Sequence, residues 1–172
     1  MIAFLDNGGA TMLPFNLQQE IFIMANNQYC KSTLSAYNNT STALANGALM
    51  PINNNSLITG CSISHVSGSN AIRLLKKGLY LVAFSASGSF TTTAGEVSLQ
   101  LYRNGVAVPT GIVTQTPTAT TDIESFSTAT IVEVKEVCPC AGTGTQSIDL
   151  TFANTGVAAT YTYFNVSVVK LA

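Results

Sequence analysis

The chain of 172 residues is long enough to bury the core of one domain, and 47% of its residues are hydrophobic while only 9% are charged. That balance excludes intrinsic disorder, which combines low hydrophobicity with high net charge. The formal net charge is −1 and no basic stripe exists, so we expect no nucleic-acid partner; no apolar run has the length of a bilayer span, so we expect no membrane insertion.

The first 30 residues differ in pattern from the remainder. The Gly8-Gly9 pair and Pro14 interrupt any early element, and the stretch from Asn16 to Cys30 mixes helical and strand periodicities. The start has no basic region, and Asp6 interrupts its apolar run, so it is a poor secretion signal. We interpret residues 1–30 as an N-terminal arm that packs on its own domain or on a neighbour.

From Ser32 onward the chain is typical of a β-sandwich or barrel, with short strand-like runs separated by turn residues. Candidate strands in the first half are "STLSAYNN", "TALANGALMPINN" with an Asn-Gly turn inside it, and "NAIRLL". The next runs over residues 79–87, after a Lys-Lys-Gly turn.

This strand is apolar on both faces at its start. Tyr80, Val82 and Phe84 alternate with Leu79, Leu81 and Ala83. A half-buried strand needs only one apolar face. The second face therefore requires a cover.

The second half continues the β pattern. "VSLQLYRNGV" predicts a hairpin with a type I′ Asn-Gly turn. Its first strand has Val97, Leu99 and Leu101 on one face and Glu96, Ser98, Gln100 and Tyr102 on the other. The later candidate strands are "SFSTATIVEV", "SIDLTF" and "TYTYFNVSVVKL". In the last one, the pattern places Phe164, Val166 and Val168 on one face and Tyr161 and Tyr163 on the other; no helix longer than three turns is predicted in 31–172.

Two explanations account for the second apolar faces. A loop or the N-terminal arm could cover them within one chain. Alternatively, they could meet other copies of the chain around a symmetry axis. Composition does not decide between the two.

The stretches "GLYLVAFSASGSF", "VSLQLYRNGVAVP" and "FNVSVVKLA", in this order, resemble the C1q/TNF-like jelly-roll superfamily. The nearest subgroup is similar to the C-terminal domains of bacterial spore-surface, collagen-like glycoproteins and their phage-encoded relatives, and "YNNTSTALANGALMPINNN" is similar to its first-strand region. The resemblance covers about residues 31–172. It departs from the family where "VKEVCPCAGTGTQ" replaces a Gly-Asp turn.

This resemblance implies an all-β, two-sheet antiparallel jelly-roll sandwich that forms a homotrimer. Carried over to this chain, it places Tyr80, Val82 and Phe84 in the core. It places a second set of residues on the face turned toward the three-fold axis, as the trimer interface: Leu79, Leu81, Ala83, Tyr161 and Tyr163.

The sequence holds no catalytic constellation, so we expect no enzyme and no cofactor. The single histidine, His65, lacks a nucleophile context, and we interpret it as a loop or edge residue. The four cysteines are Cys30, Cys61, Cys138 and Cys140. We favour a reduced, structural state; a zinc site formed by Cys61, His65 and the "CPC" pair is the alternative, although its spacing matches no common zinc module.

These observations predict a non-enzymatic structural protein of a phage virion: a trimeric head decoration, head fibre or spike whose arm, residues 1–30, binds a capsid or other virion protein. The alternative is a structural or adhesion protein of a bacterial spore or cell surface, although the collagen repeats of the spore-surface relatives do not occur here. Either protein could use its trimeric tip to contact a surface glycan.

Overall fold

The structure is a computed structural model that describes residues 31–90, 95–117, 123–135 and 147–172. The arm predicted for 1–30 lies outside the described residues. In the described ranges every regular element is a β-strand, as the sequence predicts, and no helix is long and apolar enough to cross a membrane.

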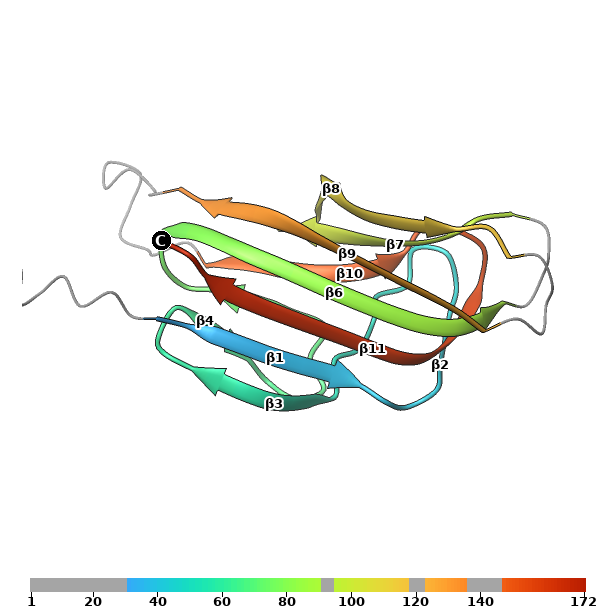
Figure 1. Cartoon of the computed structure of the whole chain (residues 1–172), viewed down its shortest axis with the longest axis horizontal. Helices are drawn as coiled ribbons and strands as arrows, with labels where there is room; N and C mark the ends of the chain where they lie inside the picture. Colours follow the sequence, from blue (N-terminus) through green and yellow to red (C-terminus); the bar gives the residue numbers. More distant parts are fainter. Residues whose placement is uncertain (1–30, 91–94, 118–122, 136–146) are drawn as a thin grey trace, which may run out of the picture.

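Two antiparallel sheets face each other across one core (Figure 1). The first, here called the front sheet, has the order β3-β1-β11-β6-β9, with β2 paired to β11 as well. Its strands are β1 (Thr33–Asn38), β2 (Thr42–Leu44), β3 (Asn54–Thr59), β6 (Gly78–Phe90), β9 (Ile123–Val134) and β11 (Ala159–Lys170).

The second sheet, here called the back sheet, has the order β4-β5-β10-β7-β8. Its strands are β4 (Ile63–His65), β5 (Ile72–Leu74), β7 (Val97–Arg103), β8 (Val106–Gln115) and β10 (Ile148–Asn154). Consecutive strands thus change sheets repeatedly, which is the connectivity of a jelly roll.

The core consists of the alternating apolar residues that the sequence pattern singles out. Tyr80 and Val82 are fully buried and Phe84 is 2% exposed, and the same alternation buries Phe164 on β11. Phe152 of the back sheet lies between two front-sheet rings, with centroid distances of 5.0 Å to Phe84 and 5.1 Å to Phe164. Aromatic contacts, one edge-to-face and one tilted, thereby join the two sheets.

The predicted hairpin between β7 and β8 is confirmed. Asn104 and Gly105 have φ values of 49° and 76°, and two successive positive φ values define the type I′ turn that Asn-Gly favours. Both faces of β7 are enclosed: Val97, Leu99 and Leu101 belong to the core, and Ser98 and Gln100, on the other face, are also buried. The Gln100 side chain donates hydrogen bonds to the backbone of the bent strand β8, at Val108 and Gly111.

The end of the chain is fixed to the start of β6. The backbone N–H of Leu79 donates to the carbonyl of Ala172 at 3.0 Å, and the N–H of Leu171 donates to the carbonyl of Leu79 at 2.8 Å. Strand β11 therefore lies beside β6 over its whole length, in the middle of the front sheet (Figure 1).

Candidate interaction surface

The outward face of the front sheet carries the residues that the sequence predicts for an interface. Leu79, Leu81 and Ala83 point away from the core on β6, and Leu79 is 40% exposed. Tyr163 lies on the same side of β11 and is 41% exposed. No described element covers these side chains, so their cover must come from elsewhere.

Tyr161 is a correction to the predicted set. It is 2% exposed and lies in the core, where its ring packs edge-on against Phe126 with a centroid distance of 6.2 Å. Its hydroxyl donates to Oδ1 of Asn154 at 3.3 Å, and burial raises the pKa of the phenol.

The physical reason is a β-bulge in β11. Tyr161 pairs with Gly88, whereas Tyr163 pairs with Ser87, so Thr162 is an extra residue without its own partner on β6. An extra residue reverses the alternation of faces. Tyr161 therefore points inward and Tyr163 outward, although the two are separated by one residue in the sequence.

The strand register arranges the outward residues in rows across the sheet. The first row joins Val169, Leu81 and Ile131, which are directly paired on β11, β6 and β9. Ile131 is 57% exposed. Directly opposed side chains lie close enough to touch, so this row forms one continuous apolar band.

The next rows hold small side chains. Ser167, Ala83 and Ala129 form the second row; Asn165, Ser85 and Ser127 form the third. Two shallow hollows of about 290 and 380 Å³ lie over this part of β6, β9 and β11. Small side chains leave room for a neighbouring chain to approach the sheet closely.

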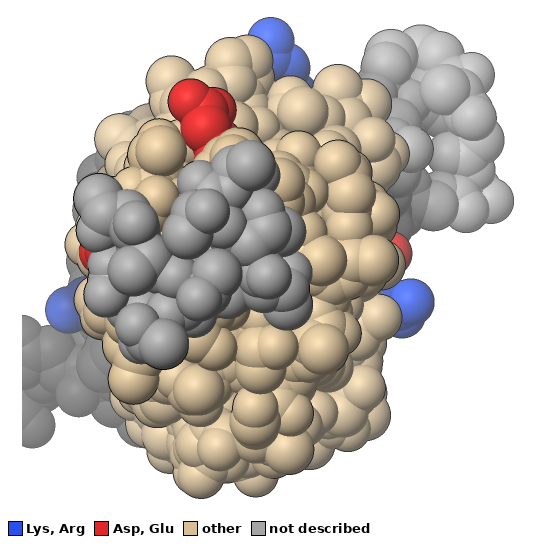
Figure 2. Space-filling view, turned by 90° about the vertical axis from the view of Figure 1, so that its right-hand side faces the viewer, with Lys and Arg blue, Asp and Glu red and all other residues tan. Residues whose placement is uncertain are grey.

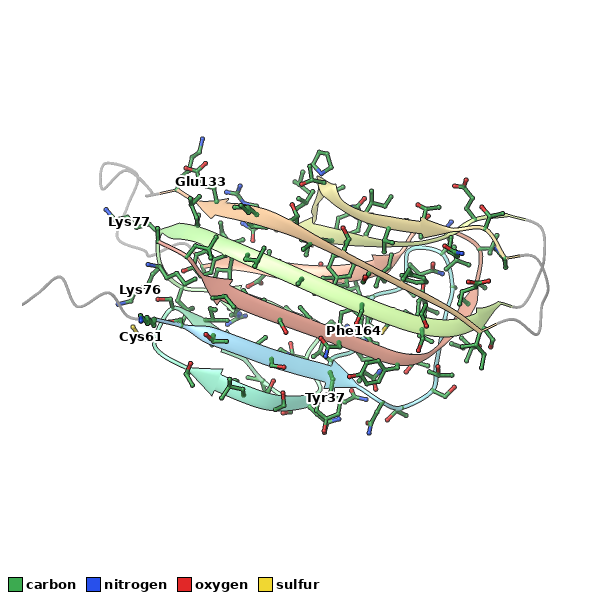
Figure 3. The ribbon with its side chains drawn as sticks, viewed as in Figure 1. Tyr37, Cys61, Lys76, Lys77, Glu133 and Phe164 are labelled. Carbon is green, nitrogen blue, oxygen red and sulfur yellow. The ribbon has the colours of Figure 1, made fainter. Side chains whose placement is uncertain are left out.

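Two tyrosines lie at the end of the outward front-sheet face that is remote from the apolar band. Tyr163 forms the fourth row with Ser87 and Ser125, and Tyr37 pairs with Asn165 from the adjacent strand β1. Figure 3 shows Tyr37 on β1, well away from the charged Lys76, Lys77 and Glu133, which lie at the end of the sandwich that holds the C-terminus. The four rows are uncharged; Glu133 is paired with Leu79, two residues before Leu81 of the first row.

Cys61 is disulfide-bonded, and its bonding partner lies outside the described residues, as do Cys30, Cys138 and Cys140. The interpretation that all four cysteines are reduced is therefore wrong. A zinc site that uses Cys61 is excluded in this state, because only a thiolate ligates the metal. Within the described ranges, no group of three His, Cys, Asp or Glu residues is arranged to hold a metal ion.

His65 is the last residue of the edge strand β4, in agreement with its interpretation as an edge residue. It is 8% exposed; Nδ1 lies 2.6 Å from Oδ1 of Asn55, and Nε2 lies 3.2 Å from the carbonyl of Ser69. Burial lowers the pKa of the imidazole, and the contact with the Ser69 carbonyl opposes this in part. These contacts tie β4 to β3 and give the histidine a structural role.

No family model and no curated protein matches the chain by sequence. Solved structures match it by fold. The PRD1 vertex protein P5 is similar with a TM-score of 0.53 and 18% identity, over 83% of this chain and 99% of that one. The globular domain of zebrafish complement 1qA matches with a TM-score of 0.60 and 9% identity, over 83% and 98%.

The Eiger TNF from S. frugiperda is a third match, with a TM-score of 0.56 and 13% identity, over 83% of this chain and 92% of that chain. The chain therefore has the C1q/TNF-like jelly-roll fold, as the resemblance implies. At these identities the likeness shows the fold alone. The nearer kinship with spore-surface domains stays a prediction.

Proposed function

We propose that this chain is a non-enzymatic, homotrimeric structural protein of a phage virion, acting as a head decoration, head fibre or spike. In this role the outward face of the front sheet forms the trimer interface, and residues 1–30 bind a capsid or other virion protein. The observation that carries the proposal is the uncovered apolar band Val169–Leu81–Ile131 on a fold shared with a phage vertex protein.

The trimer is supported by the composition of this face. An obligate interface is more apolar than the rest of a protein surface and is depleted in charge. The outward rows of β6, β9 and β11 are apolar at one end and small and neutral beyond it. A loop of the same chain is the competing cover, but no described segment lies over this face.

The virion role is supported by the fold match and by the surface. The match spans 99% of the solved chain of the PRD1 vertex protein P5, so it is not confined to a fragment of that chain. Figure 2 looks at one end of the sandwich, where few of the visible described residues are charged and most of the described surface is uncharged. A neutral surface of small polar residues suits a protein that is exposed on a particle at high copy number.

Density-gradient fractionation of phage from the source culture, with mass spectrometry of each fraction, tests the location. We expect peptides of this chain in stoichiometric amounts with DNA-filled heads. Recovery in the spore or cell-envelope fraction, with none on particles, would instead establish the bacterial surface protein. Sedimentation velocity of the purified chain tests the trimer independently.

A truncation tests the arm. Deletion of residues 1–29 keeps all four cysteines and the whole described sandwich. We expect this variant to remain a folded trimer but to lose attachment to particles when mixed with virions that lack the protein. An insoluble variant would contradict the proposal and make the arm a part of the fold.

A further inference from the structure

A hollow of about 610 Å³ lies on the back sheet, opposite the proposed trimer interface. Its lining includes Leu49, Tyr102, Asn104, Asp149 and Thr151. Its volume falls within the range of small-molecule sites. The residues come from the loop after β2, the β7–β8 hairpin and strand β10, three segments that are distant in the sequence.

The polar wall of this hollow is rigidly built. The backbone N–H of Asn104 donates to the carbonyl of Asp149 at 2.8 Å, and Oδ1 of Asn104 accepts from the N–H of Asp149 at 2.7 Å. This reciprocal pair fixes the hairpin tip to β10. Among the described residues, Nδ2 of Asn104 has no hydrogen-bond partner, so it remains available as a donor.

Asp149 supplies a hydrogen-bond acceptor, and Arg73 balances its negative charge. Its Oδ1 is buried and lies 3.3 Å from Nε of Arg73, the residue directly opposite on β5. The Arg73 guanidinium balances the carboxylate charge. Oδ2 of Asp149 makes no hydrogen bond to any described residue, and it can accept one from a ligand hydroxyl. Because the two charges balance each other, the hollow offers a charged ligand no unpaired counter-charge.

The other wall is apolar and aromatic. Tyr102 is half-buried and pairs with Thr151 of β10. Leu49 forms a β-bridge with Ala153, two residues further along β10. A tyrosine side chain has only two torsion angles, so ordering it on binding costs little conformational entropy. It offers both an apolar ring face and a hydroxyl. The hollow therefore places an apolar platform beside a donor and an acceptor.

We propose that this hollow binds a neutral sugar residue of a surface glycan. A pyranose has an apolar C–H face, which matches the Tyr102 ring, and adjacent hydroxyls, which match Nδ2 of Asn104 and Oδ2 of Asp149. A peptide strand is a poorer occupant, because the backbone groups of the central strands β7 and β10 are already paired within the sheet.

This inference rests on the proposed function, in which the trimer stands on a particle surface and presents three copies of the site. Three sites on one trimer allow a glycan-covered surface to be held firmly even where each site is weak. The back sheet stays uncovered in that trimer because the interface uses the front sheet.

The test is an array of neutral oligosaccharides probed with the labelled full-length protein, followed by NMR titration with the best binder. We expect a neutral binder whose affinity falls by about tenfold or more in Tyr102→Ala, while Tyr102→Phe retains most of it. Val66→Ala is the control: it removes an exposed apolar side chain that belongs neither to the hollow nor to the proposed trimer interface, and it should leave sugar affinity unchanged. Asp149→Asn gives a second variant of nearly the same shape and should weaken binding several-fold.

Absence of any neutral binder on the array would overturn the inference, as would binding confined to charged glycans or equal affinity in Tyr102→Ala and the unmodified protein. Sedimentation and particle attachment are measured on the same preparations. A chain that trimerises and attaches to particles but binds no sugar would defeat this inference alone. A sugar-binding chain absent from particles would defeat the proposed virion role and leave the site standing.

Discussion

His65 shows how burial changes the chemistry of a single residue. Its imidazole is enclosed by Asn55 and Ser69, and desolvation lowers its pKa in the folded state below the ordinary value of 6.5. The unfolded chain therefore takes up the proton first as the pH falls. Linkage then requires that the free energy of unfolding falls as the pH drops below about 6.5 and levels off once the folded form is also protonated.

The change His65→Gln tests this linkage. We expect the unmodified protein to lose stability to urea between pH 7.5 and pH 5.5, and the variant to lose much less over that interval. The carboxylates remain ionised across most of this window, so they contribute little to the difference. Equal pH dependence in both proteins would mean that His65 titrates normally.

Asn154 is the buried polar residue that accepts the hydrogen bond of the inward-pointing Tyr161 hydroxyl. It is fully buried, and its Nδ2 donates to the carbonyls of Leu44, Ala45 and Val157 at 3.1, 3.4 and 2.8 Å. Asn154→Ala leaves these acceptors and the Tyr161 hydroxyl without this partner. We expect it to lower the free energy of unfolding by about 2–4 kcal/mol.

Tyr161→Phe is the matched control, because it removes only the hydroxyl that bonds to Asn154. We expect a loss of about 1 kcal/mol in this variant. Both values come from chemical denaturation at one fixed protein concentration, since association would shift the apparent stability. A loss in Asn154→Ala no greater than in Tyr161→Phe would show that the amide network contributes little.

At the scale of strands, regular alternation is readable from the sequence and its interruption is not. Strand β10 follows its predicted pattern, with Ile148, Leu150 and Phe152 all buried. Strand β11 contains the bulge at Thr162, and no residue in "TYTYF" marks it. The bulge results from pairing with β6, a contact across about 75 residues of sequence, so local periodicity could not place Tyr161 correctly.

The candidate sites, too, could be predicted from the sequence only in part. Leu79, Leu81 and Ala83 could be assigned to the outward face because β6 is regular where they lie. The hollow on the back sheet could not be predicted. Tyr102 and Asp149 are ordinary strand residues in the sequence. Only the pairing of β10 with both β5 and β7 brings them together: Asp149 lies opposite Arg73 on β5, and Thr151, two residues further along β10, lies opposite Tyr102 on β7.

Gly88 is the partner that the bulge requires on β6. A Cβ atom at this position would lie 2.5 Å from the carbonyl oxygen of Thr160 and 3.0 Å from Cα of Tyr161, both of them backbone atoms. Gly88→Ala should therefore force β6 and β11 apart and cost about 2 kcal/mol or more. Ser89→Ala, at the next position, is the control and should change the midpoint of thermal unfolding little; equal midpoints would mean that the bulge can shift.

At the scale of the whole molecule, the sandwich has two faces with different properties. The front face is graded from the apolar band Val169–Leu81–Ile131 to small hydroxyl residues, and the back face carries the hollow with its ion pair. A trimer built on the front face leaves the back face outward. In the proposed arrangement, assembly and ligand contact use opposite sheets, so each could be altered by substitution without the other.

The change Leu81→Asp tests the assembly directly. Leu81 lies at the centre of the apolar band, and β6 points it away from the core, so the monomer can fold with a carboxylate there. In the proposed trimer three such carboxylates would be desolvated close to one another, and removing a charge from water without a partner costs several kcal/mol. We expect sedimentation velocity to find a folded monomer at concentrations where the unmodified chain is a trimer.

Val66→Asp is the control for the same chemical change, since Val66 follows β4 and is 75% exposed away from the front face. It should remain a trimer. Circular dichroism establishes that both variants keep the β-sheet signal. If Leu81→Asp also remained a trimer of unchanged stability, the subunits would have to associate through another surface, and the apolar band would need a different cover, with a segment of the same chain the first to examine.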